Sequence, residues 1–204
     1  QTLGKDAKIA IIEWGYWEDH EDLDVILEPN QRLFEIPIVD SPNHGTACLG
    51  IVNAIDQERE GGTAMGMRGM VPDAQAYFFP LTSINEGPRE MDAWLNAFDT
   101  LGPGDAISAS YGPGGSNLNE TQDMWDLFRV GSDLGIVICI AAGNDCVNLD
   151  DAEDLGDSGA LVVGACSPGS PHYRLVFSNF ATSNDNAISN RVHVKAWGEF
   201  VATT

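Results

Sequence analysis

The chain has 204 residues, of which 43% are hydrophobic, so it is long and apolar enough to form a globular domain. Its 10 basic and 31 acidic residues give a formal net charge of −21, which disfavours binding to nucleic acid or to anionic lipid. No apolar run approaches the roughly 18 residues of a membrane span, and no signal-peptide pattern opens the sequence. We therefore expect a single globular domain with no nucleic-acid or membrane partner.

Short apolar runs predict six strands, and several of them are continuously apolar, as is typical of strands buried on both faces of a sheet. The predicted strands are 8–12, 74–79, 105–110, 135–142, 159–165 and 191–196. The predicted helices are 44–54, 88–100 and 119–135, and the Gly-rich stretch 57–69 predicts a surface loop. This alternation of strands and helices indicates an α/β fold with a mainly parallel sheet.

Two of the predicted helices carry apolar residues at the spacing of a buried helix face. In the segment 88–100 these residues are Met91, Trp94, Leu95 and Phe98. In the segment 119–135 they are Met124, Leu127 and Phe128, and a capping-box pattern of Asn119 and Gln122 precedes them. We expect these side chains to form core and not a binding site.

The cysteines predict no disulfide framework. Cys48, Cys139, Cys146 and Cys166 include no C-x-x-C pair, which disfavours a zinc site or a thioredoxin-like motif. All but the third lie in apolar runs and are interpreted as buried free thiols, although the sequence leaves a disulfide open.

Polar residues at the ends of the predicted strands are the first candidates for a functional site. Glu13, Ser110 and Asn144 each follow or end an apolar run, and His44 stands at the start of a predicted helix. Because functional groups gather at the carboxyl ends of parallel strands, these residues are expected at one edge of the sheet.

Seven short segments, in order along the chain, carry a family resemblance. They are HGTACLG (44–50), GMVPDAQAY (69–77), ISASYG (107–112), IAAGN (140–144), ALVVGA (160–165), FSNF (177–180) and VKAWGE (194–199). Each is weak alone, but in this order they resemble the sequence blocks of the subtilisin-like serine proteases (subtilases, peptidase S8 type). The resemblance implies a three-layer α/β/α fold and one catalytic domain over residues 1–204.

Peptide hydrolysis needs a nucleophile, a base, an acid partner that orients the base, and donors for the oxyanion. The resemblance implies that His44 is the general base and that Asn144 donates its side-chain amide to the oxyanion. The residues alone also fit a structural histidine at a helix start and an asparagine in a turn.

The acid partner departs from the family pattern. Glu13 stands where the family has aspartate, and although it is one methylene longer it can still accept the imidazole N–H. Asp19 and Asp22 are the alternatives, and Asp22 matches a non-catalytic position of the family. We take Glu13 as the candidate triad acid.

The nucleophile is the second departure, because no Gly-Thr-Ser block of the family occurs in these residues. The candidate serines, Ser110, Ser167, Ser170 and Ser178, fall in segments that match other blocks. We expect the domain to be incomplete at its C-terminus and its serine to come from a C-terminal segment or a second chain. The alternative is a pseudo-protease that binds peptides or acts as a scaffold. A nucleotide-binding domain is disfavoured, since no Gly-rich loop follows the first strand.

The resemblance also predicts how a polypeptide substrate binds. Ser110, Tyr111 and Gly112 would form an edge strand for an extended peptide, although Tyr111 fits a core position equally well. No cofactor is required. The acidic stretch 145–157 is a candidate for Ca²⁺, but it lacks EF-hand spacing and we interpret it as a solvated loop. The family is largely secreted, while the apparently free cysteines leave an intracellular enzyme open.

Overall fold

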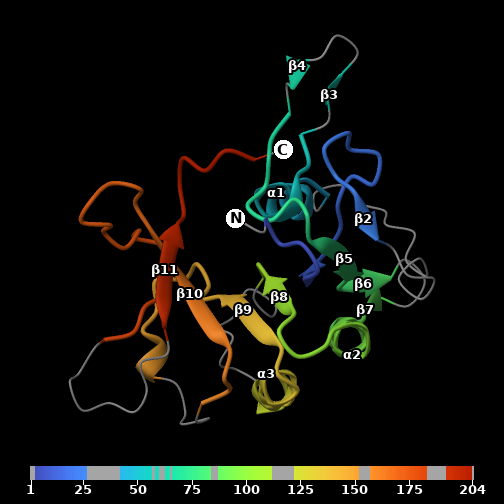
Figure 1. The fold of residues 1–204 in the computed structure, drawn as a ribbon. Helices are drawn as coiled ribbons and strands as arrows, with labels where there is room; N and C mark the ends of the chain where they lie inside the picture. Colours follow the sequence, from blue (N-terminus) through green and yellow to red (C-terminus); the bar gives the residue numbers. More distant parts are fainter. Residues whose placement is uncertain are drawn as a thin grey trace. The chain divides into compact units, whose positions relative to one another are not determined.

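The structure is a computed structural model, which describes residues 3–26, 42–56, 58–59, 63–64, 66–83, 87–111, 122–151, 157–182 and 192–203. The chain divides into two compact units. Figure 1 shows the helices and strands of the described residues, coloured along the sequence. The first comprises Gln1–Ser108 with Ala202–Thr204, and the second comprises Ala109–Val201. None of the described helices is both long enough and apolar enough to cross a bilayer. The single incomplete domain expected from the sequence stays a prediction.

Parallel strands form the centre of the first unit. β1 (Lys8–Glu13) pairs in parallel with β5 (Gln75–Pro80), and Glu13 lies opposite Pro80. β2 (Val25–Ile26) pairs with the other edge of β5, and β8 (Ala106–Ala109) is the second neighbour of β1. The last four residues of β1 are buried, as the continuous apolar run predicts. The bounds of β1 and β5 therefore agree with the sequence prediction to within one residue.

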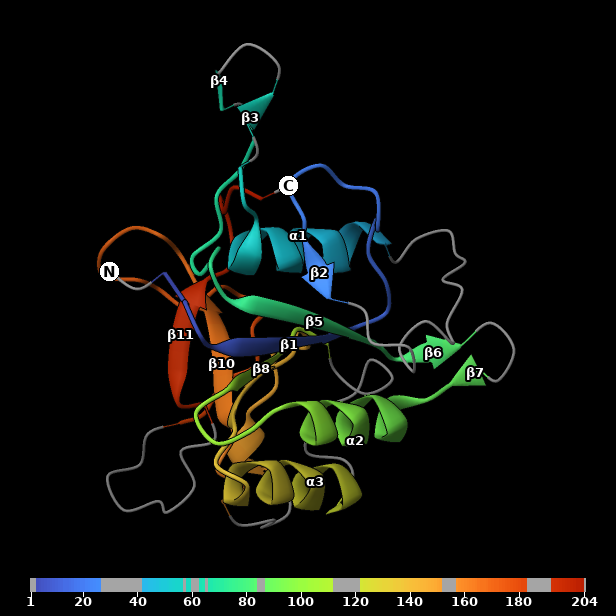
Figure 2. The ribbon, with the colours of Figure 1, turned by 45° about the vertical axis from the view of Figure 1, so that its right-hand side comes forward.

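Helices cover both faces of these strands. Figure 2 shows α1 (Pro42–Asn53) on one face of β1 and β5 and α2 (Glu90–Thr100) on the other. A three-layer arrangement is thus present within the first unit, and it buries β1 from above and below.

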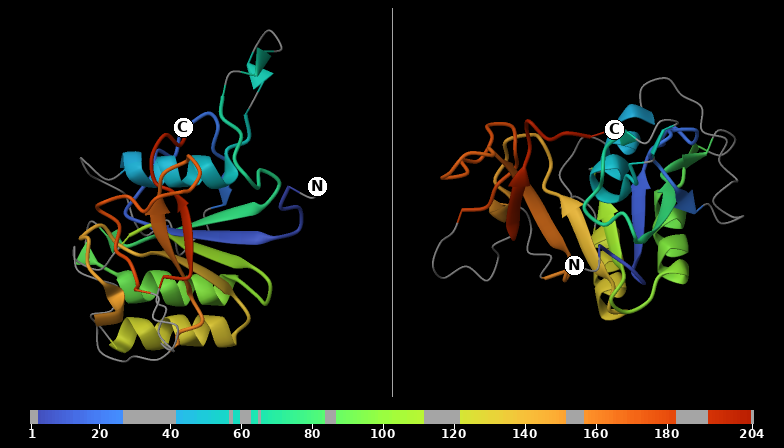
Figure 3. Two further views of the ribbon diagram at one scale, coloured as in Figure 1. Left: turned by 90° about the vertical axis from the view of Figure 1, so that its left-hand side faces the viewer. Right: turned by 45° about the horizontal axis from the view of Figure 1, so that its top comes forward.

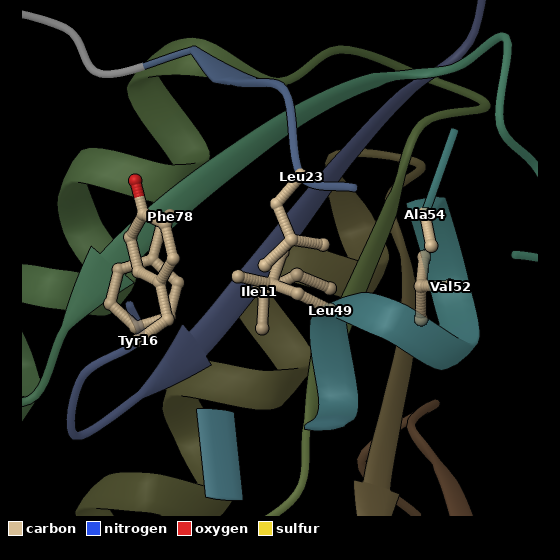
Figure 4. Close-up of a cluster of buried hydrophobic side chains, with 7 residues drawn as sticks. All are labelled: Ile11, Tyr16, Leu23, Leu49, Val52, Ala54 and Phe78. Carbon is tan, nitrogen blue, oxygen red and sulfur yellow. The ribbon is translucent and has the colours of Figure 1, made fainter. Parts of the chain in front are cut away.

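A hydrophobic cluster fills the space between α1 and the sheet (Figure 4). It consists of Ile11, Tyr16, Leu23, Leu49, Val52, Ala54 and Phe78. The rings of Tyr16 and Phe78 are 4.6 Å apart between centroids, within the range of favourable aromatic pairs. Full burial of each large side chain contributes about 1.5–3 kcal/mol, so this cluster anchors α1 to β1.

The buried face of α2 differs from the prediction. Trp94 and Phe98 are buried as expected, but Met91 and Leu95 are 42% and 47% exposed. The other buried positions are alanines, Ala93 and Ala97, which let the helix approach the sheet closely. The buried face is therefore centred between Trp94 and Ala97, and the two exposed residues lie outside its margin.

Two short antiparallel pairs were not predicted. β3 (Glu58–Arg59) pairs with β4 (Thr63–Ala64) inside the stretch 57–69, for which the sequence predicts a loop. β6 (Thr82–Ser83) pairs with β7 (Gly87–Pro88), so α2 begins two residues after the predicted start of its helix. Strands of two residues are too short to show an alternating pattern, which explains why the sequence did not reveal them.

The second unit also contains parallel strands. β9 (Val137–Ala141), β10 (Leu161–Cys166) and β11 (Val194–Trp197) run side by side (Figure 3). α3 (Gln122–Asp133) packs against β9 and buries Met124, Leu127 and Phe128, as predicted. A short 3₁₀ helix, Leu149–Asp151, lies in the chain between β9 and β10.

Some predictions fall partly or wholly outside the described residues. Asn119 of the capping box lies outside them, as do residues 152–156 of the acidic stretch 145–157. All four cysteines are free, including the three that the sequence analysis interprets as buried free thiols. Of these three only Cys166 is buried, whereas Cys48 and Cys139 are half-buried.

Candidate active site

A carboxylate at the end of β1 and an imidazole at the start of α1 meet in the first unit. Glu13 Oε1 lies 2.9 Å from His44 Nδ1. The carboxylate side chain is 0% exposed, whereas the imidazole is 58% exposed. The site therefore combines a fully desolvated acid with a histidine that remains open to solvent on its far side.

The backbone next to Glu13 fixes the other carboxylate oxygen. The N–H of Trp14 donates to Glu13 Oε2 over 2.9 Å. Among the described residues, the imidazole is the partner that reaches Oε1, since no other donor bonds to that buried oxygen. Oε2 is thus held by the backbone, and Oε1 faces the imidazole of His44.

The residues that follow His44 explain how α1 is brought so close to β1. A Cβ built on Gly45 would lie 2.0 Å from the carbonyl oxygen of Gly15, so only glycine allows this approach. Thr46 Oγ1 donates to the carbonyl of Pro42 (2.6 Å) and accepts the N–H of Trp17 (2.9 Å). Pro42 suits the first turn of a helix, where its missing N–H is not needed. Gly45 thus permits the close approach, and Thr46 links the start of α1 to the loop after β1 by hydrogen bonds.

The surroundings of His44 favour its protonated form. The hydrogen bond to the Cys48 sulfur, and then that to the Glu13 carboxylate, raise the pKa of His44 from 6.5 to about 10, against the opposing effect of burial. Glu13 therefore stabilises the imidazolium of His44, which is what the acid of a catalytic triad does after the histidine has taken up a proton.

Cys48 is a neighbour of the site that sequence reasoning missed. Its sulfur lies 3.8 Å from His44 Nδ1, on the same face of α1 one turn along. The apolar run around it predicts only a buried thiol. The signal in the sequence is its spacing of four residues from His44, which places the two side chains together on a helix.

The alternative acids do not pair with His44. Asp22 is buried and its Oδ2 accepts the N–H of Met67 over 3.2 Å, which is a structural role. Asp19 is exposed. Among the described residues, Glu13 is the carboxylate within ion-pair distance of His44.

Asn144 lies in the second unit, exposed in the loop that follows β9. Gly143 before it has a φ of +99°, a conformation that favours glycine. The loop is held by Asn179, whose Oδ1 accepts the N–H groups of Asp145 (2.9 Å) and Val147 (3.1 Å). The Asn179 Nδ2 donates to the carbonyl of Ala142 over 2.8 Å. Sequence reasoning matched the FSNF segment but did not assign this positioning role to Asn179.

The predicted cleft residues are only partly described. Ser110 is half-buried and Tyr111 is 9% exposed, which fits the alternative of a core tyrosine, while Gly112 lies outside the described residues. Ser178 is 1% exposed, donates to the carbonyl of Asn179 and accepts the N–H of Ala165, so it is a structural serine.

Comparison with solved structures shows that the chain has a subtilisin-like α/β fold. A psychrophilic subtilisin-like protease, Apa1 from Pseudoalteromonas sp. AS-11, matches with a TM-score of 0.66 at 18% identity over 97% of this chain and 42% of that one. A cold-adapted subtilisin-like serine proteinase gives 0.66 at 13% identity, over 98% of this chain and 66% of the other. The prenylagaramide maturation protease PagA gives 0.67 at 16% identity, over 99% of this chain and 67% of the other. The predicted fold is confirmed.

The family model of the subtilases (Peptidase S8) matches residues 4–200, and the chain belongs to this family. The predicted resemblance is thus confirmed over nearly all of the sequence. No curated protein matches the chain. The chain spans less than two thirds of the length of the first two structures above.

Proposed function

We propose that the protein is a serine endopeptidase of subtilisin type, which hydrolyses peptide bonds with His44 as general base and Glu13 as its acid partner. The observation that carries the proposal is the 2.9 Å approach of a fully buried carboxylate to an exposed imidazole. Family membership supports peptidase activity in general, and the geometry supports these two roles.

The hydrogen bond to Glu13 selects the tautomer that catalysis needs. In the neutral imidazole, which the raised pKa of about 10 places at alkaline pH, Nδ1–H is donated to the carboxylate and the lone pair of Nε2 can accept a proton from a serine hydroxyl. When Nε2 takes that proton, the positive charge forms beside the Glu13 carboxylate, which is already desolvated and cannot turn away. Charge stabilisation of this kind requires no rearrangement at the moment of reaction.

The longer side chain of glutamate is accommodated by the backbone. Its Oε2 accepts the N–H of the next residue, Trp14, which turns Oε1 toward the imidazole. Glu13 therefore supplies the same contact that the family's aspartate makes, and we propose it as a competent triad acid.

The other components of the reaction are proposed from the family resemblance. The nucleophile is a serine outside residues 1–204, in a C-terminal segment or a second chain. Asn144 donates its amide to the oxyanion, and Ser110, Tyr111 and Gly112 bind the extended polypeptide substrate. The chemistry requires no cofactor, since the proton transfers and charges are handled by side chains and amides.

Labelling with a fluorophosphonate probe tests the proposal in the full-length protein. Labelling of one serine is expected, with loss in His44→Ala and retention in Glu13→Asp. His172→Asn is the matched control, because His172 is an exposed histidine that contacts the carbonyl of Ser167, and this variant should label normally. Persistent labelling of His44→Ala would show that the base is another residue.

The pseudo-protease remains the competing proposal, since glutamate replaces the family's aspartate. It predicts that the full-length protein binds peptides without reacting with the probe. The downstream coding sequence separates the two cheaply, because the peptidase requires a Gly-Thr-Ser block and the pseudo-protease does not.

A further inference from the structure

Three potential metal ligands of different chemistry converge at the start of α1. A carboxylate oxygen of Glu13, an imidazole nitrogen of His44 and the sulfur of Cys48 all lie within 4.8 Å of one another. Two come from successive turns of one helix and the third from the end of β1. The spacing of four residues brings His44 and Cys48 together on α1, and the fold adds Glu13 from β1.

The carboxylate is turned into this cluster from a buried position. Glu13 is 0% exposed, and among the described residues its Oε1 has the imidazole nitrogen at 2.9 Å and no other donor. A desolvated carboxylate oxygen needs a cation or a proton donor beside it. On its other side the cluster is open, because His44 is 58% exposed and Cys48 is half-buried.

The distances between the ligand atoms approach those of a tetrahedral metal site. Zinc bonds of about 2.3 Å to sulfur and about 2.1 Å to nitrogen or oxygen separate S from N by about 3.6 Å and N from O by about 3.4 Å. The observed separations are 3.8 Å for Cys48 Sγ to His44 Nδ1 and 2.9 Å for His44 Nδ1 to Glu13 Oε1. Shifts of a few tenths of an ångström, within the range of side-chain rotation, would suit the ion.

We propose that Glu13, His44 and Cys48 form a binding site for a single zinc ion, with the fourth position open to solvent. Thiolate, imidazole and carboxylate are the ligand types that zinc takes together, whereas calcium and magnesium prefer oxygen alone. The net charge of −21 raises the concentration of cations near the surface, which favours capture of the ion.

Zinc at this position would oppose the proposed peptidase. The ion takes the place of the proton on His44 Nδ1 and displaces the proton of the Cys48 thiol to solvent. The imidazole proton then resides on Nε2, which becomes a donor and can no longer accept the proton of a serine. This inhibitory consequence depends on the proposed function, but binding of the ion does not.

The site can be tested by titrating zinc chloride into the full-length protein in the presence of excess magnesium and measuring the heat of binding by calorimetry. One zinc ion per chain is expected, and binding should weaken more than about tenfold in Cys48→Ser and in Glu13→Gln. Cobalt(II) should give a thiolate charge-transfer band that is lost in Cys48→Ser. Cys146→Ser is the matched control, since Cys146 is an exposed free cysteine of the second unit and should leave binding unchanged.

Circular dichroism of each variant shows whether it is folded, and if Cys48→Ser is not, the zinc affinity of Glu13→Gln decides the question. Absence of specific zinc binding, or equal binding by the wild type and both ligand variants, would overturn the site. Zinc binding without probe labelling would support the zinc site and refute the peptidase. Probe labelling without zinc binding would support the peptidase and refute the zinc site.

Discussion

Replacing Gly45 with alanine is the sharpest test of how the site is built. The added Cβ would lie 2.0 Å from the carbonyl oxygen of Gly15, 3.0 Å from its carbonyl carbon and 3.5 Å from Glu13 Cβ. The first contact is with backbone, so no side chain can rotate away to relieve it. The start of α1 must therefore move away from the loop after β1 by more than 1 Å before this contact becomes ordinary.

The displacement acts directly on the pair of Glu13 and His44. Their contact of 2.9 Å cannot survive a movement of this size, whereas Cys48 moves with His44 on the same helix. In Gly45→Ala we expect the pKa of His44 to fall below about 10 but to stay above 6.5, because the contact with Cys48 is kept; an NMR titration of the imidazole Cε1–H measures this. Overpacking should lower the free energy of unfolding by about 1–3 kcal/mol. A misplacement of about 1 Å should lower kcat/KM about 100-fold.

Gly102→Ala is the matched control in the same unit. A Cβ at Gly102 meets only Asp105 Oδ2 at 3.9 Å, an ordinary van der Waals contact. This variant should keep the pKa of His44 and the stability of the wild type. An unchanged pKa of His44 in a folded Gly45→Ala protein would refute the view that the glycine sets the distance between the acid and the base.

Four further outcomes are expected. Asn53→Ala should lower the free energy of unfolding by about 1–3 kcal/mol in urea titrations, because the Asn53 amide donates to two carbonyls from a position 1% exposed. Asn179→Ala should speed hydrogen exchange at the amide of Asp145, which loses its acceptor. Cys48→Ala should lower the pKa of His44 and move the acid limb of kcat/KM to lower pH, because the bond to Cys48 is the largest cause of the raised pKa. The stabilising contribution of His44 should be complete below pH 6.5 and lost as the pH rises through about 10, measured against His44→Gln, because the folded state raises this pKa.

Each of these outcomes has a result that contradicts it. Asn53→Ala within about 0.5 kcal/mol of the wild type would show that its amide bonds contribute little. Unchanged exchange at Asp145 would remove the positioning role of Asn179. An acid limb that stays in place in Cys48→Ala would mean that the thiol does not influence the base. A stability difference between wild type and His44→Gln that is constant with pH would exclude a raised pKa for His44.

The sequence predicted the elements whose signal is local and strong. β1 and β5 are continuously apolar because both of their faces are covered, and their bounds were predicted to within one residue. The burial of Met124 and Phe128 on α3 was also foreseen, since one apolar face packs against β9. For α2 the spacing of large apolar residues wrongly predicted Met91 and Leu95 in the core. This spacing does not reveal that buried alanines let the helix approach the sheet closely.

For the candidate site too, the sequence predicted some residues and missed others. Glu13 and His44 were identified by type and order, and the structure brings them within 2.9 Å of each other. The contact between His44 and Cys48 was missed because an apolar neighbourhood was taken as evidence of simple burial. The role of Asn179 could not be foreseen, since it depends on a side chain that reaches back 34 residues to the N–H of Asp145.

The hydroxyl of Thr46 constrains which residues this position can hold. It has one proton, which goes to the carbonyl of Pro42, so it meets the N–H of Trp17 only as an acceptor. Valine has almost the same shape but would leave the N–H of Trp17 without this acceptor, whereas serine would keep both hydroxyl bonds. A hydroxyl therefore matters more than the shape of the side chain at position 46. When a library of variants at this position is selected for folded protein, serine should be retained and valine lost.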